Sequence, residues 1–280
     1  MQAETVIGVD LGGTKVQSAR VEGRQIVATA KQLITSTGTE EEVLLEVIAS
    51  IAAVMSPEVS AIGIGVPSVV DIEKGIVYDV QNIPSWKEVH LKDRLESQFQ
   101  VPVFMNNDAN CFALGEHRFG KGQGRQNMIG LIIGTGMAAG IILHGRLYNG
   151  QHGGAGEFGM IPYQDQYIEY YASGQFFSNI HQTNGQAVAL AASQGDAKAL
   201  ALFAEYGHHL ASGIKAILYA LDPGLIVLGG SVSQSYAFFK EPLWEALQTF
   251  AYRPIIENLQ IEVSEDMMIP VLGAAGLCLG

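Results

Sequence analysis

A short turn near the N-terminus combines groups that could hold a phosphate and a metal ion. Asp10 ends an apolar run, and Gly12, Gly13, Thr14 and Lys15 follow it. Adjacent glycines allow a sharp turn and let a ligand approach the backbone N–H groups. Those N–H groups, the Thr14 hydroxyl and the Lys15 ammonium suit a phosphate, whereas the Asp10 carboxylate suits Mg²⁺ held through water. An ordinary β-hairpin with a Gly-Gly turn explains the same residues, so this stretch alone leaves both interpretations open.

Two further glycine turns follow apolar runs later in the chain. Gly134, Thr135 and Gly136 come after one run, and Gly229 and Gly230 come after another. Taken by itself, the first of these turns is better explained as a plain hairpin turn. The second would expose backbone groups at the carboxyl end of a strand, where α/β proteins usually bind ligands. Together with the N-terminal turn, they weaken the explanation by hairpins alone.

Asn107 and Asp108 stand between an apolar strand and an expected helix. Asp108 could be a general base, because phosphoryl transfer to a hydroxyl needs a carboxylate within hydrogen-bond reach of that O–H group. Asn107 could then bind neighbouring hydroxyls. The alternative is that Asp108 or Asn110 simply caps the helix.

Two glutamates are further candidates for ligand contacts. Glu157 lies in the glycine-rich stretch 150–159, and Glu169 lies among tyrosines. A loop carboxylate is either solvated or directed at a ligand, and a carboxylate beside aromatic rings suits a sugar. A glutamate on a helix surface would give the same pattern as Glu169, so its role stays open. No set of cysteines and histidines has the spacing of a zinc site.

Composition narrows the class of protein. The chain has 280 residues and a net charge of −12, with 48% hydrophobic and 16% charged residues. This length allows two ordinary domains or one large domain, and the 33 glycines suit an α/β protein with many tight turns. An acidic surface disfavours nucleic-acid binding. Two cysteines, no leader pattern and no long apolar run predict a reduced cytoplasmic protein without a membrane span.

Apolar periodicity predicts alternating strands and helices along the chain. Three strands are expected within 5–34, and further strands are expected at 60–67, 101–105, 127–134, 137–143, 225–228 and 258–263. Helices are expected after Thr39 and at 91–99, 106–117, 197–221, 242–250 and 273–279.

Taken together, these motifs resemble the ROK family (repressors, open reading frames, kinases) of sugar kinases. The resemblance covers essentially the whole chain and is carried, in family order, by Asp10–Lys15, Gly63–Pro67, Asn107–Asp108, Ile133–Gly136, Gly156–Gly159 and Leu221–Gly230. It implies the ribonuclease H-like α/β fold of the actin/hexokinase ATPases, with two lobes and a cleft between them. We expect a small lobe at 1–110, completed by a C-terminal helix at 272–280, and a large lobe at 111–271.

The resemblance also implies a role for each motif. ATP and Mg²⁺ are the expected cofactors, with Asp10 holding Mg²⁺ through water, and a small-molecule sugar is the expected partner. Nucleotide contacts are implied for Asp10, Gly12, Gly13, Thr14, Lys15, Gly134, Thr135, Gly136, Gly229 and Gly230. Sugar contacts are implied for Pro67, Asn82, Asn107, Asp108, Glu157 and Glu169. Asp108 would be the catalytic base, and a homodimer is implied by the resemblance only.

Departures from the family pattern support a second hypothesis. Met160 stands where the family has a histidine, and the cysteine-rich zinc loop before Glu169 is missing. We therefore expect no structural zinc and weaker discrimination between sugars. The alternative is a catalytically weak or inactive sugar sensor that binds a sugar and a protein partner. A DNA-binding repressor is not expected, because the first strand is predicted from residue 5. The retained acidic and polar motif residues favour an ATP-dependent sugar kinase.

Overall fold

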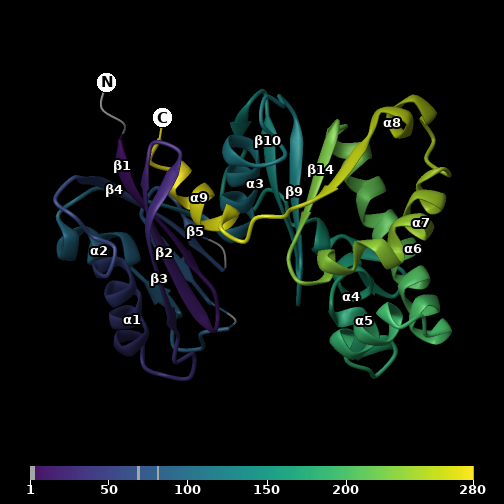
Figure 1. Cartoon of the computed structure of the whole chain (residues 1–280), viewed down its shortest axis with the longest axis horizontal. Coiled ribbons are helices and arrows are strands. Elements are labelled where there is room, and N and C mark those ends of the chain that lie inside the picture. Colours follow the sequence, from purple (N-terminus) through teal and green to yellow (C-terminus); the bar gives the residue numbers. More distant parts are fainter. Residues whose placement is uncertain (1–3, 68–69, 81, 280) are drawn as a thin grey trace. The chain divides into compact units, whose positions relative to one another are not determined.

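The computed structural model describes residues 4–67, 70–80 and 82–279. The chain divides into two compact units. Unit 1 contains Met1–Gly124, Gly140–Ala155 and Asp266–Gly280, and unit 2 contains Arg125–Ala139 and Gly156–Glu265. Figure 1 shows the elements of both units along the chain.

A five-stranded sheet in the order β3-β2-β1-β4-β8 forms the centre of unit 1. Its strands are β1 (Thr5–Leu11), β2 (Lys15–Glu22), β3 (Gln25–Leu33), β4 (Val59–Val66) and β8 (Val103–Asn107). The first three strands are antiparallel, which confirms the predicted hairpin at the glycine pair. β4 runs parallel to both β1 and β8. The carboxyl ends of β1, β4 and β8 therefore meet at one edge of the sheet.

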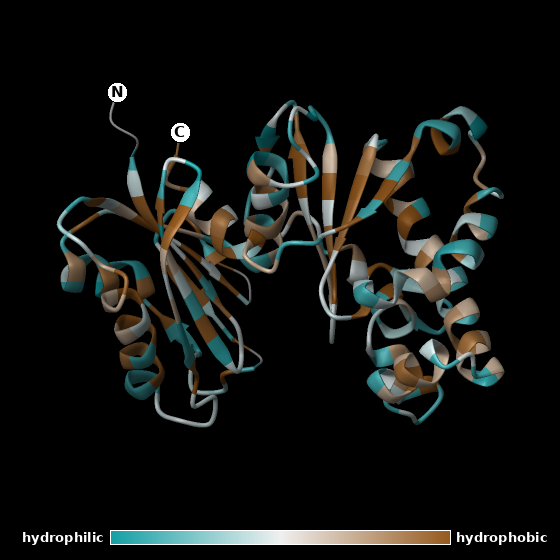
Figure 2. Cartoon of the chain, in the orientation of Figure 1, coloured by the Kyte–Doolittle hydropathy of each residue, from teal (hydrophilic) through white to brown (hydrophobic). Residues whose placement is uncertain are grey.

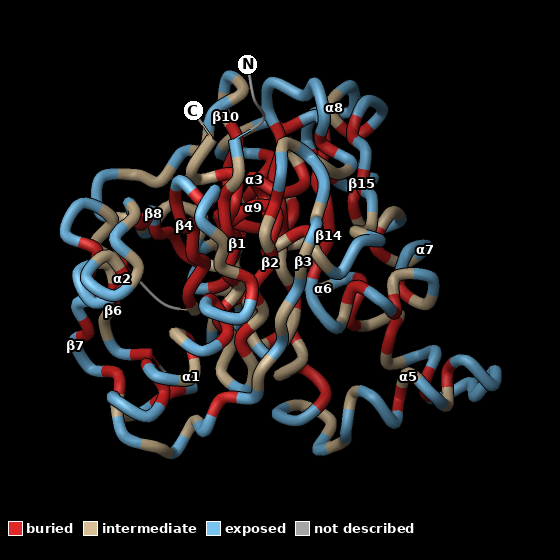
Figure 3. The backbone as a smooth tube through the Cα atoms, turned by 60° about the vertical axis from the view of Figure 1, so that its left-hand side comes forward, coloured by how far each residue is buried: buried red, intermediate tan, exposed pale blue. Residues whose placement is uncertain are grey.

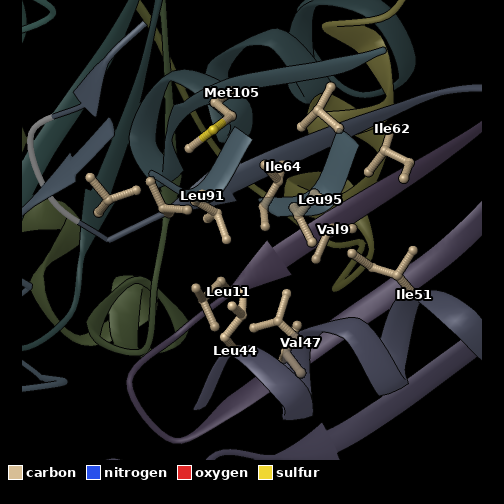
Figure 4. Packing of buried hydrophobic residues seen from close by; sticks show 14 of the residues in the cluster. Val9, Leu11, Leu44, Val47, Ile51, Ile62, Ile64, Leu91, Leu95 and Met105 are labelled. Atoms are coloured by element: carbon tan, nitrogen blue, oxygen red, sulfur yellow. The ribbon is translucent and has the colours of Figure 1, made fainter. Parts of the chain in front are cut away.

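Helix α1 (Glu40–Ala52) covers one part of this sheet and begins after Thr39, as the sequence predicts, with Thr39 as its cap. The Thr39 N–H donates to Glu42 Oε2 at 2.7 Å, and the Glu42 N–H donates to Thr39 Oγ1 at 3.3 Å. This reciprocal pair satisfies donors that the helix itself leaves unpaired. The buried face of α1 includes Leu44 and Val47, which pack with strand residues in the core shown in Figure 4.

Helices α3 (Asp108–Phe119) and α9 (Ile269–Gly276) pack against each other at backbone distance. A Cβ atom added at Gly273 would lie 1.7 Å from the Cys111 carbonyl oxygen, and one at Gly115 would lie 2.2 Å from the Ile269 carbonyl oxygen. Only glycine fits at these two positions. Both helices are largely buried, as Figure 3 shows.

Smaller elements complete unit 1. Strands β5 and β6 form a short antiparallel hairpin, and Val69, just before β5, lies outside the described residues. β7 extends that hairpin, and β11 pairs with the end of β10 (Met137–Leu143). Their bounds are β5 (Val70–Asp71), β6 (Ile76–Tyr78), β7 (Glu88–Val89), α2 (Leu91–Phe99) and β11 (Arg146–Leu147).

Unit 2 is built on a second sheet, in which β14 lies between β9 and β15 and parallel to both. β14 is hydrophobic along its length, as Figure 2 shows, because both its faces are buried. The strands of unit 2 are β9 (Met128–Ile133), the residues of β10 up to Ala139, β12 (Pro162–Tyr163), β13 (Gln166–Tyr167), β14 (Leu225–Gly229) and β15 (Gln260–Val263). The helices are α4 (Ile168–Ala172), α5 (Gly185–Ser193), α6 (Ala197–Leu221), α7 (Tyr236–Leu247) and α8 (Arg253–Asn258).

Two helices begin earlier than their sequence predicts. α7 was expected from Pro242 but starts at Tyr236, with Pro242 inside the helix. Its buried residues Phe239 and Leu243 pack on α6 at Gly207, so tertiary contacts override the local preference of proline. α9 starts at Ile269, because Pro270 is tolerated in a first helical turn, and it ends at Gly276.

The unit boundaries also differ from the expected lobes. α3 belongs to unit 1, although the expected boundary fell after residue 110, because α3 packs on α9. The stretch Gly140–Ala155 joins unit 1 as well. The C-terminal part of unit 1 begins at Asp266, earlier than the expected residue 272, and Gly280 lies outside the described residues.

In the described part of the chain, no helix combines the length and apolarity that a membrane crossing requires.

Replacing Gly273 with alanine should destabilise the protein by about 1–3 kcal/mol, because the new methyl group would overlap the α3 backbone. Urea unfolding of the Gly273→Ala variant measures this loss. Gly224→Ala is the matched control, since a Cβ there meets no atom within 4 Å. Equal stability of the two variants would contradict the packing.

Candidate active site

The ends of three parallel strands bring Asp10 and the start of α3 together in unit 1. Asp10 pairs in register with Gly65 of β4, and Gly65 pairs with Asn106 of β8. Asp108 follows two residues later as the first residue of α3. Gly65 lets α3 lie close to β4, because a Cβ there would lie only 3.0 Å from Cys111 Sγ on α3. Two carboxylates that are far apart in the sequence thus share one edge of the sheet.

The electrostatic setting makes Asp108 an unusually weak acid. Burial, and to a smaller extent the negative charge of Asp10, raises the pKa of Asp108 to about 6. The Ala109 N–H donates to Asp108 Oδ1 at 2.8 Å and offsets part of the shift. Burial also raises the pKa of Asp10, whereas the ammonium of Lys15 lowers it. A carboxyl group with a pKa near 6 is ionised at neutral pH and is still basic enough to accept a proton.

Asn107 is the cap of α3. Its Oδ1 accepts a hydrogen bond of 2.7 Å from the Asn110 N–H. The alternative in which Asp108 or Asn110 caps this helix is therefore wrong, because Asp108 is already in the first turn. The Asp108 carboxylate accepts the Ala109 N–H through Oδ1 and does not serve as the helix cap.

The N-terminal glycine turn is tight and lies against Asn82. The Gly12 N–H donates to the Lys15 carbonyl at 2.9 Å, which closes the turn. A Cβ at Gly13 would lie 2.3 Å from the Asn82 Cβ, so a larger residue at Gly13 would displace Asn82. Thr14 and Asn82 are exposed, and Pro67 is half-buried after the end of β4.

The second glycine turn, in unit 2, is held by Glu169. The Met137 N–H donates to Glu169 Oε2 at 2.7 Å, and the Gln175 side chain donates to Glu169 Oε1 at 2.8 Å. A Cβ at Gly136 would lie 2.6 Å from Glu169 Oε2. Glu169 therefore supports the turn through its carboxylate, in addition to any ligand that it contacts.

Residues after α4 support the same turn from another side. The Gly174 N–H donates to the Gly134 carbonyl at 2.7 Å, and the Ser173 hydroxyl donates to the Thr135 carbonyl at 3.0 Å. These bonds use carbonyl oxygens of the turn. The second turn is thus a fixed element and not a loose loop.

A hollow of about 370 Å³ in unit 2 is lined by two of the predicted glycine motifs or their neighbours. Gly134 and Thr135 line it from one side, and Ser231 lies directly after Gly230 at its wall. Gly230 has a φ of +85°, and its missing side chain lets it approach the Ile133 carbonyl. The volume lies within the usual range for small-molecule pockets.

The predicted site residues fall into two sets, one in each unit. Unit 1 carries Asp10, Gly12, Gly13, Thr14, Lys15, Pro67, Asn82, Asn107 and Asp108. Unit 2 carries Gly134, Thr135, Gly136, Glu157, Glu169, Gly229 and Gly230. Glu157 is exposed in front of a short 3₁₀ helix at Phe158–Met160, and Met160 at the end of that helix is 56% exposed.

Metal ligands are sparse. Among the described residues, no group of three or more His, Cys, Asp and Glu side chains could hold a metal ion. Mg²⁺ usually needs only one or two carboxylates, since water and substrate phosphates complete its shell. The Asp10 carboxylate, beside a second carboxylate and a phosphate-type turn, fits such an ion.

An amide network beside Asp108 was not predicted. The Asn106 and Asn110 side chains both donate to Asn149 Oδ1, at 3.0 and 3.2 Å, and Asn110 also donates to Asn106 Oδ1 at 2.8 Å. Asn106 and Asn110 are buried. The network ties the stretch after β11 to the junction of β8 and α3. Only the repeated asparagines around Asp108 hinted at it, because Asn149 is remote in sequence.

Gln175 was missed as well. It contacts Glu169 and lines the unit 2 hollow. Its position follows from a π-helical turn that begins at Phe176, and such a turn has no clear sequence signal.

Comparison with known proteins identifies the family. The sequence profile described as ROK family matches residues 6–280. The chain belongs to the ROK family. A glucokinase from Streptomyces coelicolor is 29% identical, and the match covers 97% of this chain and 96% of the relative. An N-acetyl-D-glucosamine kinase from Photobacterium profundum is also 29% identical, with coverage of 84% and 86%.

A solved structure confirms the predicted fold class. The ROK family glucokinase from Streptomyces griseus, crystallised with glucose and AMPPNP, matches with a TM-score of 0.81 at 29% identity. The match covers 98% of each chain. The ROK family chain described here therefore has the α/β fold of the actin/hexokinase ATPases, as its sequence motifs predicted.

The raised pKa of Asp108 predicts how stability depends on pH. Between about pH 4 and pH 6 the folded protein binds this proton more tightly than the unfolded chain, so its stability falls as pH rises through that window. Asp108→Asn removes the buried charge and should raise the unfolding free energy at pH 8 by about 1–3 kcal/mol, with no gain at about pH 4.

Urea unfolding across this pH range measures the effect, and Asp71→Asn is the contrasting control. The N–H and ammonium groups of Lys74 lower the pKa of Asp71, so its charged form stabilises the fold. The control should therefore lose stability above about pH 4. Equal pH dependence of both variants would contradict the burial of the Asp108 charge.

Proposed function

We propose that the chain transfers the γ-phosphoryl group of ATP to a hydroxyl group of a hexose or an N-acetylhexosamine, with Asp108 as the general base. The observation that carries this proposal is the carboxylate of Asp108 at the start of α3, with its pKa raised to about 6 beside Asp10. Such a group can take the proton of the attacking sugar hydroxyl as the phosphoryl group transfers. Membership of the ROK family and the kinases among the relatives support the same reaction.

The glycine turns supply the proposed nucleotide contacts. Backbone N–H groups near Gly12 and Gly13, with the Thr14 hydroxyl and the Lys15 ammonium, suit the terminal phosphates. The turn Gly134–Gly136 suits a second part of the phosphate chain. The hollow of about 370 Å³ beside that turn suits the nucleoside, with Gly229 and Gly230 at the end of β14.

Mg²⁺ is the proposed metal, held by Asp10 through water and by the phosphates of ATP. When bound, the ion would offset negative charge on the phosphates and near the two carboxylates. Asp108 accepts the proton in this scheme, and Lys15 lies close enough to Asp10 to lower its pKa.

Sugar hydroxyls are the proposed ligands of the remaining motif residues. Asn107 keeps its side-chain N–H₂ group available, because its Oδ1 caps α3. The other proposed sugar contacts are Pro67, Asn82, Glu157 and Glu169. Glu169 already accepts two hydrogen bonds, so its sugar contact would use the remaining lone pairs of its carboxylate.

A sugar sensor without strong catalysis is the second candidate. The exposed Met160, in place of the histidine that the family resemblance implies, favours it, because a thioether cannot donate a hydrogen bond to a hydroxyl. A site that lacks one polar partner discriminates less well between sugars. The sensor would bind a sugar and a protein partner and would leave ATP intact.

A coupled ATP assay tests the kinase against the sensor. The wild-type chain should phosphorylate at least one sugar among glucose, N-acetylglucosamine, N-acetylmannosamine, mannose, fructose and allose. Asp108→Asn should lower turnover about 10²- to 10⁴-fold, because the proton acceptor is lost, and should keep nucleotide binding measured by calorimetry. Asp79→Asn, on an exposed ion pair with Lys87, is the matched control and should keep full turnover.

Two results would overturn parts of this proposal. Unchanged turnover of Asp108→Asn would remove Asp108 from the role of base. No turnover of the wild type on any of these sugars would favour the sensor.

The pH profile gives an independent test of the base. kcat/KM of the wild-type enzyme should rise with pH and level off above an apparent pKa of about 6, because only ionised Asp108 accepts the proton. Initial rates at low sugar concentration, from pH 4.5 to 8, measure this limb (a range of roughly two units around that pKa). A profile that stays flat across it would show that another group acts as base.

The proposed homodimer rests on the family resemblance, whereas the proposed cytoplasmic location rests on the low number of cysteines. Analytical ultracentrifugation of the full chain tests the first of these expectations.

A further inference from the structure

A second hollow, of about 380 Å³, lies in unit 1 beside the edge strand β8. None of the residues proposed to bind ATP or the sugar lines it. It is formed by β8, by the end of α3, by β11 and by the segment after α9. Any ligand here would therefore occupy a place that the kinase reaction does not use.

The floor of this hollow is apolar. Phe104, Leu147, Leu277 and Leu279 are among its lining residues. The Phe104 side chain is 44% exposed, which is unusual for a phenylalanine on a strand and leaves its ring accessible. Such a floor favours the apolar body of a ligand over inorganic ions.

Three cations surround the floor, and the described lining residues include no Asp or Glu. They are Lys92, Arg118 and Arg146. Within the described residues, their side chains make no hydrogen bond or ion pair. Several other cations of unit 1 are paired, as in the contacts Lys74–Asp71 and Arg94–Glu41. Three uncompensated positive charges at one place are notable in a chain with a net charge of −12.

Desolvation makes the lack of counter-charges costly. Arg118 is half-buried, and this burial lowers the pKa of its guanidinium. An anion bound beside a partly desolvated guanidinium replaces part of the hydration that burial has removed. Guanidinium groups also bind carboxylates and phosphates through bidentate hydrogen bonds.

We propose that this hollow is a binding site for an organic anion with an apolar body, whose carboxylate, phosphate or sulfonate contacts Arg118, Arg146 and Lys92 while its body packs on Phe104 and the leucines. The volume and the mixture of an apolar floor with a few charged groups are typical of small-molecule sites. The site is independent of the proposed kinase function, so each can fail without the other.

A fluorescence titration of the full chain with 1-anilinonaphthalene-8-sulfonate tests the site. This probe carries a sulfonate on an aromatic body, so it should bind saturably. The neutral analogue N-phenyl-1-naphthylamine, which lacks the sulfonate, should bind roughly tenfold more weakly, because a charge-assisted contact is lost. Inorganic phosphate, which lacks the apolar body, should displace the probe only weakly, and saturating ATP should not displace it.

Variants locate the binding. Arg118→Gln and Arg146→Gln should each lower the affinity for the probe roughly tenfold, and Phe104→Ser should also lower this affinity. Lys31→Gln and Lys198→Gln make the same charge change at exposed positions outside the hollow and should bind the probe as the wild type does. Circular dichroism and thermal midpoints establish that each variant is folded. Because Arg146 is exposed on β11, Arg146→Gln is the variant that should disturb folding least.

Three outcomes would overturn the proposal. The first is equal affinity for the neutral analogue. The second is displacement of the probe by ATP, which would move it to the nucleotide hollow. The third is unchanged binding in both arginine variants.

Discussion

Backbone-distance packing around α9 is the constraint on which unit 1 depends. A Cβ at Gly8 or Gly63 would lie 2.0 or 1.8 Å from carbonyl oxygens of α9, and Gly273 has the same relation to α3. These glycines allow direct contact between the helix and sheet backbones, because they have no side chain that would separate them. The parallel strands β1, β4 and β8 are held in register beneath the helices. That register sets Asp10 and the first turn of α3 at one edge of the sheet.

The same arrangement creates an electrostatic cost. Burial makes ionisation of Asp108 unfavourable and the nearby carboxylate of Asp10 adds to this, so the pKa of Asp108 rises to about 6. A rigid framework is needed to hold them there, since free side chains would move apart. The proposed reaction uses this raised pKa, because a carboxylate with a higher pKa is a stronger base. At Asp108 the buried charge that lowers the stability of the fold is therefore the charge that the proposed reaction needs.

Local chemistry accounts for the features that the sequence predicted well. The helix start after Thr39, the Gly-Gly hairpin and the long helix α6 each depend on residues within a few positions of one another. The position of Asp108 at the start of a helix was also local information. The early start of α7 was not, because it depends on packing against α6 at Gly207. The role of Asn149 could not be predicted from local sequence either, because its hydrogen-bond partners are about forty residues away.

The sequence by itself determined the class of this protein: the ROK motifs, their order, the α/β fold and the candidate carboxylates. The tertiary structure alone decided that burial and the charge of Asp10 raise the pKa of Asp108, that Glu169 holds the turn after β9, and that Asn107 caps α3. It also decided that α3 belongs with the N-terminal sheet and that three cations, which form no ion pair within the described residues, line the hollow beside β8. The reason is physical. Turns and caps depend on neighbours in sequence, whereas a carboxylate's pKa and a hollow's charge depend on groups that only folding brings together.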